Sequence, residues 1–106
     1  MSKVVQITDE KNVKDFIKEY DDKCLIVQFH ATWCQPCKKL GPILKEKAEK
    51  ANVDLVQLDV DDNEENAEKF EVNGIPRVLF FKKGELVYDH TGADVAKLDN
   101  GFNKLK

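Results

Sequence analysis

The chain has 106 residues, of which 42% are hydrophobic and 35% charged, values that predict one small globular domain spanning residues 1–106 rather than a disordered chain. The net charge of −3 at pH 7 favours neither nucleic acid nor an anionic membrane surface as a partner.

The N-terminal segment lacks the apolar run of a signal peptide, and no stretch approaches the roughly 18 apolar residues of a membrane span. We therefore expect a cytoplasmic protein that does not associate with membranes. The three cysteines are Cys24, Cys34 and Cys37. An odd, low count argues against a disulfide-stapled secreted scaffold, and a close pair in a reducing compartment is more often catalytic or metal-binding than structural.

The first sixty residues alternate between strand and helix patterns. Residues 4–7 and 25–29 are short apolar runs that predict strands, and the nearly continuous apolar character of the second is typical of a buried central strand. Between them, four apolar residues fall on one face of a helix, namely Val13, Phe16, Ile17 and Tyr20. Thr8 or Asp9 can cap this helix. Residues 34–51 predict a second helix, whose apolar stripe consists of Leu40, Ile43, Leu44, Ala48 and Ala51.

The second half of the chain predicts a strand at residues 53–60 and a short polar helix at residues 63–70. Residues 77–82 and 85–88 predict a β-hairpin, because the turn signal Lys83-Gly84 separates them. A last amphipathic helix is marked by Val95, Leu98, Phe102 and Leu105.

This order of elements predicts an α/β fold. The first three strands, connected by helices, require right-handed crossovers between parallel strands. The hairpin adds antiparallel strands. We therefore expect a central mixed β-sheet flanked by helices on both faces.

The sequence WCQPCK, residues 33–38, lies where a predicted strand gives way to a helix. Two residues between the cysteines, at the first turn of a helix, bring the two sulfur atoms within reach of each other. Cys34 then faces the unpaired N–H groups and the positive end of the helix dipole, which favour its thiolate. Pro36 suits a first-turn position, where its missing N–H costs no hydrogen bond. Lys38 adds a nearby positive charge.

This arrangement predicts dithiol–disulfide exchange. Cys34 would attack a client disulfide and form a mixed disulfide, and Cys37 would then attack the sulfur of Cys34 and release the reduced client. We expect Cys34 to be the more exposed of the two cysteines and Cys37, one turn further along, to be more buried.

Other uses of the two cysteines are less well supported. A zinc site needs four ligands, and Cys24, His30 and His90 do not form a second ligand pair. A c-type haem needs His after the second cysteine, where Lys38 stands. Purely structural thiols rarely flank a proline at a helix start. We therefore expect no metal and no bound cofactor.

Several segments together resemble the thioredoxin family. The resemblance covers essentially the whole chain in the right order, and the combination is far more specific than any one segment. The matching segments are Phe29-x-Ala31-x with the cysteine motif that follows it, Asp59-Val60-Asp61, Gly74-Ile75-Pro76, Phe81-Lys82-x-Gly84 and Gly92-Ala93.

The resemblance implies roles for residues around the cysteines. Trp33 would pack beside them and shape the client-binding surface, and Gly92 would leave room for the client. Pro76 would follow a cis peptide bond opposite Cys34, leaving the backbone N–H and C=O of Ile75 available to an extended client segment. The plainer interpretations are a core aromatic for Trp33 and a turn glycine for Gly92.

The chain departs from the thioredoxin pattern beneath the cysteines. Gln28 stands where the family usually carries a buried Asp, which is thought to help move the proton of the second cysteine. Glutamine cannot titrate, although Gln28 could still hydrogen-bond a water or Cys37. Many bacterial members place Lys near that Asp, and Gln57 occupies the corresponding position here. We expect Cys37 to deprotonate more slowly as a result.

Four further residues leave alternatives open. Gln35 replaces the usual glycine between the cysteines and could cover the sulfurs or touch clients. Arg77 follows Pro76, either as a cation beside the client groove or as a solvated surface charge. His30 either tunes Cys34 or packs at the surface. Cys24 is expected to be a semi-buried small hydrophobe rather than a regulatory thiol.

These features predict a cytoplasmic protein-disulfide reductase of the electron-carrier type. It would be kept reduced by thioredoxin reductase or an equivalent donor and would act on client proteins with disulfides. Three alternatives stay open: an oxidant or isomerase of the same fold, a binding module that uses the groove at Trp33 and Pro76, and, rarely, an iron–sulfur cluster shared by two copies.

Overall fold

The computed structural model describes residues 3–7 and 13–106, so the predicted cap at Thr8 or Asp9 lies outside the described residues. Each predicted strand and helix is present, with bounds that differ from the prediction by a few residues. In chain order they are β1 (Val4–Ile7), α1 (Val13–Lys18), β2 (Cys24–His30), α2 (Gln35–Ala51), β3 (Asp54–Asp59), α3 (Glu64–Lys69), β4 (Arg77–Lys82), β5 (Glu85–Thr91) and α4 (Val95–Lys104).

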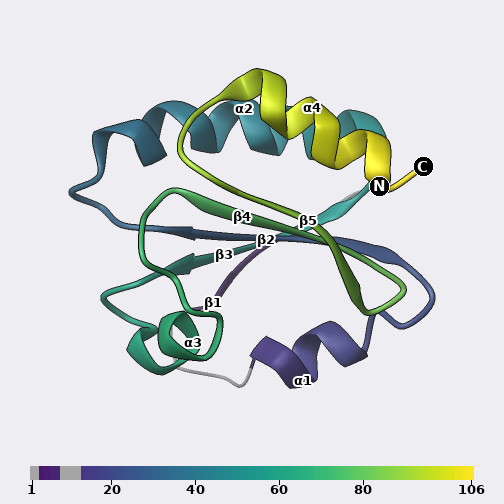
Figure 1. Ribbon diagram of the computed structural model, residues 1–106, viewed down its shortest axis with the longest axis horizontal. Helices are drawn as coiled ribbons and strands as arrows, with labels where there is room; N and C mark the ends of the chain where they lie inside the picture. The colour runs from purple at the N-terminus through teal and green to yellow at the C-terminus, as the bar shows by residue number, and fades with distance from the viewer. Residues whose placement is uncertain (1–2, 8–12) are drawn as a thin grey trace.

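The strands form one sheet in the order β1-β3-β2-β4-β5. The first three strands along the chain run parallel, and β4 and β5 pair antiparallel. Helices α1 and α3 cover one face of the sheet, and α2 and α4 cover the other (Figure 1). The predicted mixed sheet with helices on both faces is therefore confirmed.

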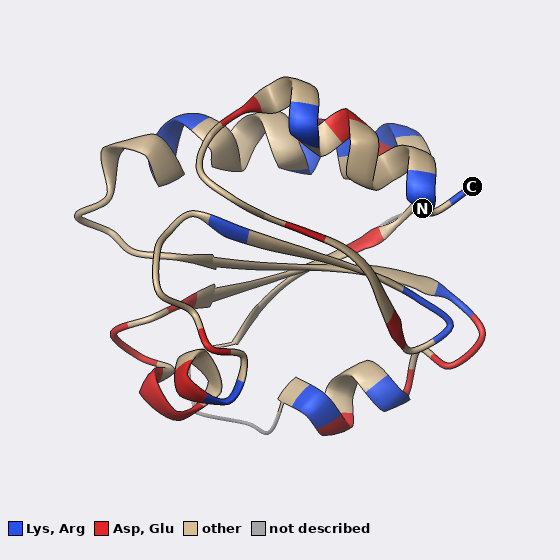
Figure 2. Cartoon of the chain, in the orientation of Figure 1, with Lys and Arg blue, Asp and Glu red and all other residues tan. Residues whose placement is uncertain are grey.

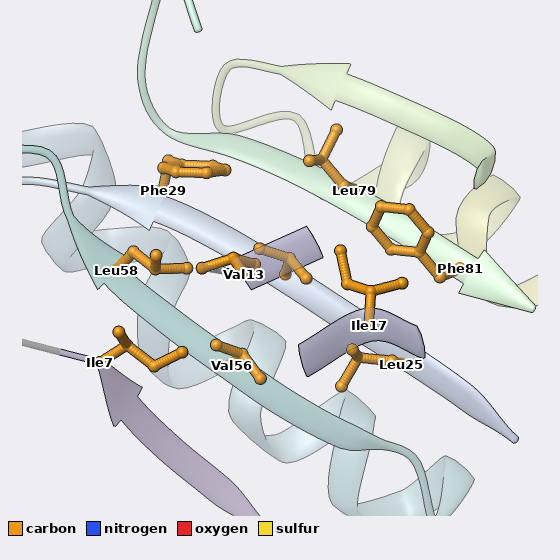
Figure 3. Close-up of a cluster of buried hydrophobic side chains, with 10 residues drawn as sticks. Ile7, Val13, Ile17, Leu25, Phe29, Val56, Leu58, Leu79 and Phe81 are labelled. Atoms are coloured by element: carbon orange, nitrogen blue, oxygen red, sulfur yellow. The ribbon is translucent and has the colours of Figure 1, made fainter. Parts of the chain in front are cut away.

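Strand β2 lies at the centre of the sheet, and its side chains alternate between the two faces. Leu25 and Phe29 point into the core beneath α1 and α3 (Figure 3), and Val27 belongs to the same cluster. Ile26 packs into the opposite core, beneath α2 and α4. The same alternation places Gln28 on the α2 side of the sheet, directly below the cysteine motif.

Two apolar cores, one on each face, hold these layers together. Burial of each large side chain contributes roughly 1.5–3 kcal/mol of transfer free energy. The core beneath α1 and α3 consists of Ile7, Val13, Ile17, Leu25, Val27, Phe29, Val56, Leu58, Leu79 and Phe81 (Figure 3). The core beneath α2 and α4 consists of Ile26, Leu40, Leu44, Ala48, Val53, Leu55, Val78, Phe80, Leu98 and Leu105.

The hairpin of β4 and β5 returns the chain to the end of the sheet where Pro76 lies. Its turn residues Lys83 and Gly84 have φ values of 53° and 79°, and positive φ at both positions is typical of a two-residue hairpin turn. Strand β5 is longer than predicted because pairing continues until Thr91 lies opposite Arg77. This extra length brings Gly92 next to Pro76, where the Gly92 N–H donates a hydrogen bond of 2.8 Å to the Pro76 carbonyl.

Charged residues of both signs are interspersed over the helices, and α3 is mainly acidic (Figure 2). Within residues 3–7 and 13–106, no helix has the length and apolar character needed to cross a membrane.

Candidate functional site

The two cysteines of the motif lie at the N-terminus of α2. Cys34 is the N-cap residue, and its sulfur accepts a hydrogen bond of 3.2 Å from the backbone N–H of Cys37. Their Cα atoms are 5.3 Å apart, and the sulfurs are joined as a disulfide. Pro36 occupies the first turn, as predicted. The helix therefore directs its unpaired N–H groups and positive dipole end towards the Cys34 sulfur.

The expected difference in exposure between the two cysteines is not present. Cys34 is 5% exposed and Cys37 is 4% exposed. Both pack with Ala31, and the partly buried side chains of Val60 and Ile75 lie against them. The prediction was wrong for this oxidised form because the disulfide draws both sulfurs into one apolar cluster. What distinguishes Cys34 is its N-cap position.

Trp33 lies on the surface beside the disulfide. Its side chain is 65% exposed, so its interpretation as a core aromatic is wrong. The indole N–H donates a hydrogen bond of 2.9 Å to the Asp61 carboxylate, in the segment that follows β3. This bond holds a large apolar ring in an exposed position next to Cys34. The sequence alone does not identify Asp61 as this partner, because Trp33 and Asp61 lie 28 residues apart.

A second loop borders the disulfide. The peptide bond between Ile75 and Pro76 is cis, and Ile75 packs against the cluster that contains both cysteines. Gly92 has a φ of 110°, a conformation that side chains rarely adopt, and its N–H is bonded to the Pro76 carbonyl. The structure thus brings together Trp33, Ile75, Pro76 and Gly92 from three separate parts of the sequence.

Gln28 is 1% exposed and lies beneath the disulfide. Its side-chain oxygen accepts a hydrogen bond of 2.8 Å from the side-chain amide of Gln57 on β3. The oxygen of Gln57 in turn accepts a hydrogen bond from the amide of Gln6 on β1. Three neutral side chains therefore form a chain of hydrogen bonds across the parallel strands. The register of β1 against β3 places Gln6 beside Gln57, which the sequence alone does not indicate.

A pocket of about 240 Å³ opens between this amide chain and α2. Gln28 and Gln57 line it from the sheet, and His30 lines it from the end of β2. Cys37 and Lys38 line it from the helix. His30 is half-buried, and its Nε2 has no hydrogen-bond partner among the residues that the structure describes.

Gln35 and Lys38 are exposed on the first turns of α2. Together with Pro36, they line a groove of about 720 Å³ between α2 and the segment before α4. Ala93 and Val95 form the other side of this groove.

Arg77 and Cys24 have partners of their own. Arg77 forms an ion pair of 3.1 Å with Asp89 on β5, and its side chain is 18% exposed, so it is not a freely solvated cation. Cys24 is half-buried at the opposite end of β2, and its sulfur donates a hydrogen bond of 3.6 Å to the Leu105 carbonyl. Among the described parts of the chain, no three His, Cys, Asp or Glu side chains are grouped to hold a metal ion.

A disulfide at a helix N-terminus, bordered by an exposed tryptophan and a cis-proline loop, defines a thiol–disulfide exchange protein. The family model described as thioredoxin matches residues 3–104 of this chain. Thioredoxin of Homo sapiens is 38% identical over 103 residues, which cover 96% of this chain and 98% of that protein. Thioredoxin of Equus caballus is 37% identical over 97 residues, covering 91% and 92%.

Solved structures agree with these relatives. The reduced thioredoxin pre-protein of Schistosoma mansoni superposes with a TM-score of 0.90 at 33% identity, covering 99% of this chain and 100% of that one. A thioredoxin from Nicotiana alata gives a TM-score of 0.88 at 30% identity, covering 99% and 94%. The chain belongs to the thioredoxin family. It is a protein-disulfide oxidoreductase that works by dithiol–disulfide exchange.

Proposed function

We propose that this protein is a protein-disulfide reductase in which Cys34 is the attacking nucleophile and Cys37 the resolving thiol. The observation that carries the assignment is the position of Cys34 at the N-cap of α2. There, the backbone N–H of Cys37 and the positive end of the helix dipole stabilise a thiolate on Cys34. Cys37 lies one turn into the helix, with its sulfur within bonding distance of Cys34.

The exchange has two steps. The Cys34 thiolate attacks one sulfur of a client disulfide, forms a mixed disulfide and releases one client thiolate. The Cys37 thiolate then attacks the Cys34 sulfur, forms the Cys34–Cys37 disulfide and releases the second client thiolate. Two electrons pass to the client, and the two cysteines of the protein are oxidised.

The surface around Cys34 supports client binding. Trp33 offers an exposed apolar ring next to the sulfur, and Asp61 fixes its orientation. Across the site, Pro76 has no N–H to continue a strand, so the backbone of Ile75 is the group that an extended client segment would pair with. The open conformation at Gly92 keeps side-chain bulk away from that approach.

The remaining parts of the proposal concern the setting in the cell. Residues 1–106 would act as one thioredoxin domain in the cytoplasm. Because the site holds only one dithiol, each turnover leaves it oxidised, so a donor such as thioredoxin reductase must restore the thiols. Electrons would pass from that donor through Cys34 and Cys37 to client disulfides.

Variants of the individual cysteines test this assignment. In a Cys24→Ser background, we expect Cys37→Ser to form a stable mixed disulfide with a disulfide-bonded client such as insulin, visible on a non-reducing gel. Cys34→Ser should form little or no mixed disulfide, because Cys37 lies within the first turn of α2 rather than at its N-cap. A stable adduct through Cys37 in the Cys34→Ser variant would contradict the assigned roles.

A further inference from the structure

The second exchange step needs a proton acceptor. Cys37 attacks only as a thiolate, and a free cysteine has an ordinary pKa of about 8.5, so at neutral pH most such thiols are protonated. A group that removes the proton as attack begins would speed the release of the client. The helix N-terminus already favours the thiolate of Cys34, the N-cap residue, but it gives Cys37 no acceptor for its proton.

The pocket of about 240 Å³ beneath the disulfide offers a place for that acceptor, because Cys37 lines it. It is wide enough for water, whose share of liquid volume is about 30 Å³ per molecule. Gln28 and Gln57 form its floor and cannot accept a proton at neutral pH. Lys38 and Lys45 line it from α2, but an ordinary lysine is already protonated at that pH.

His30 is the remaining titratable side chain of the pocket lining. It follows Gln28 by two positions on β2, so the two side chains point to the same face of the sheet, towards α2. Its Nε2 is buried, with no hydrogen-bond partner in residues 3–7 and 13–106. An imidazole nitrogen in this state can accept a proton, and imidazole is the side chain that changes charge near neutral pH.

We propose that His30 is the general base that takes the proton of Cys37 in the second step, through a water in the pocket that both residues line. Pocket water carries the proton from the Cys37 sulfur to the imidazole of His30 as the Cys37–Cys34 sulfur bond forms. The bond between Cys34 and the client sulfur breaks, and the departing client thiolate takes up a proton from the imidazolium or from solvent. This inference rests on the proposed roles of Cys34 and Cys37.

Charged groups of both signs surround His30. Lys38 and Lys45 line the same pocket from α2. On β3, Asp59 lies opposite in register, and its carboxylate accepts a hydrogen bond of 2.8 Å from the Asp61 backbone. On β4, the nearest cation is Arg77, which is paired with Asp89.

Stopped-flow mixing of the reduced protein with dithiobis(nitrobenzoate) separates the two steps, because each step releases one coloured thiolate. In a Cys24→Ser background, His30→Gln should leave the first release unchanged. His30→Gln should slow the second release about tenfold to a hundredfold at pH 7. This factor lies at or below the low end of the range for general-base catalysis. The pH profile of the second rate should differ from that of the parent, and in the variant this rate should rise with hydroxide concentration.

His90→Gln is the matched control, because His90 also has an unpartnered buried Nε2 but does not line this pocket. Both of its rates should equal those of the parent. Adding Gln28→Asp to His30→Gln places a carboxylate in the same pocket and should restore most of the second rate. Because a carboxylate at residue 28 can accept the proton by itself, the rescue is judged against Gln28→Asp in the parent, which should gain less in the second rate than His30→Gln does.

The outcomes separate the two proposals. A parental second rate and pH profile in His30→Gln would overturn the role of His30 while leaving the exchange mechanism intact. Loss of the first release in the parent protein itself would overturn the assignment of Cys34 instead.

Discussion

His90 is a single side chain that makes the stability of the fold depend on pH. It lies on β5 opposite Val78, half-buried beneath α4, and its Nε2 has no partner among the described residues. Burial lowers its pKa below the ordinary histidine value, and the nearby Lys97 lowers it further. The folded protein therefore holds this histidine neutral where the unfolded chain would protonate it.

The sign of the resulting pH dependence follows from that difference. The unfolded state binds the extra proton, so stability is complete above the ordinary pKa of about 6.5 and is lost as the pH falls through the lower folded-state value. We expect His90→Gln to reduce the loss of unfolding free energy between pH 7 and 5. One proton changes that slope by at most about 1.4 kcal/mol per pH unit.

Urea denaturation of the oxidised protein across this range measures the effect. Lys97→Gln should reduce the slope by a smaller amount, because it removes a cation but leaves the buried imidazole. Parallel curves for the parent and His90→Gln would show that His90 does not titrate between the folded and unfolded states.

Two glycines inside helices, Gly101 and Gly41, differ in how much space a Cβ atom would have. A Cβ added at Gly101 of α4 would overlap the ring of Phe80, which packs against Phe102 and Tyr88. A Cβ added at Gly41 of α2 would meet nothing within 4 Å. Helix α4 can therefore approach the sheet closely only because residue 101 has no side chain.

We expect opposite effects of the same substitution at these two positions. Gly101→Ala should destabilise the protein by roughly 1–3 kcal/mol through overpacking. Gly41→Ala should stabilise it by roughly 0.5–1 kcal/mol, because alanine is the better helix former and the site has room. The midpoints of urea denaturation of the two variants and the parent, measured under the same conditions, test both predictions. A stable Gly101→Ala protein would contradict the close approach of α4 to Phe80.

The elements that the sequence predicts well are those set by local patterns of residues. The helical spacing of Val13 and Ile17 and the turn at Lys83-Gly84 reflect local physics, so these elements are where the sequence places them. The length of β5 depends on pairing with β4, a non-local property, and was underestimated. The equal burial of Cys34 and Cys37 likewise depends on Val60 and Ile75, which arrive from distant segments.

At the scale of the whole molecule, the site forms where the sheet brings several segments together. The cysteine motif could be predicted from its own residues, because the helix start is local. The bond from Trp33 to Asp61 and the amide chain through Gln28 could not be predicted, since they depend on how distant segments are placed by the strands.

The buried pair Asn63 and Asn66 is a further feature that the sequence does not predict. Asn63 donates hydrogen bonds of 2.8 Å and 3.1 Å to the Ile7 and Asp59 carbonyls and so ties the loop after β3 to β1.

The direction of electron flow is the central claim, and the reduction potential of the Cys34–Cys37 pair tests it most directly. The protein would be equilibrated with glutathione or dithiothreitol buffers, quenched in acid and alkylated, and the reduced fraction counted. A reductase should give a potential of about −270 mV, the value for thioredoxin, and stay largely oxidised except in strongly reducing buffers. A potential of about −180 mV or higher, in the range of isomerases and oxidants, would contradict the account.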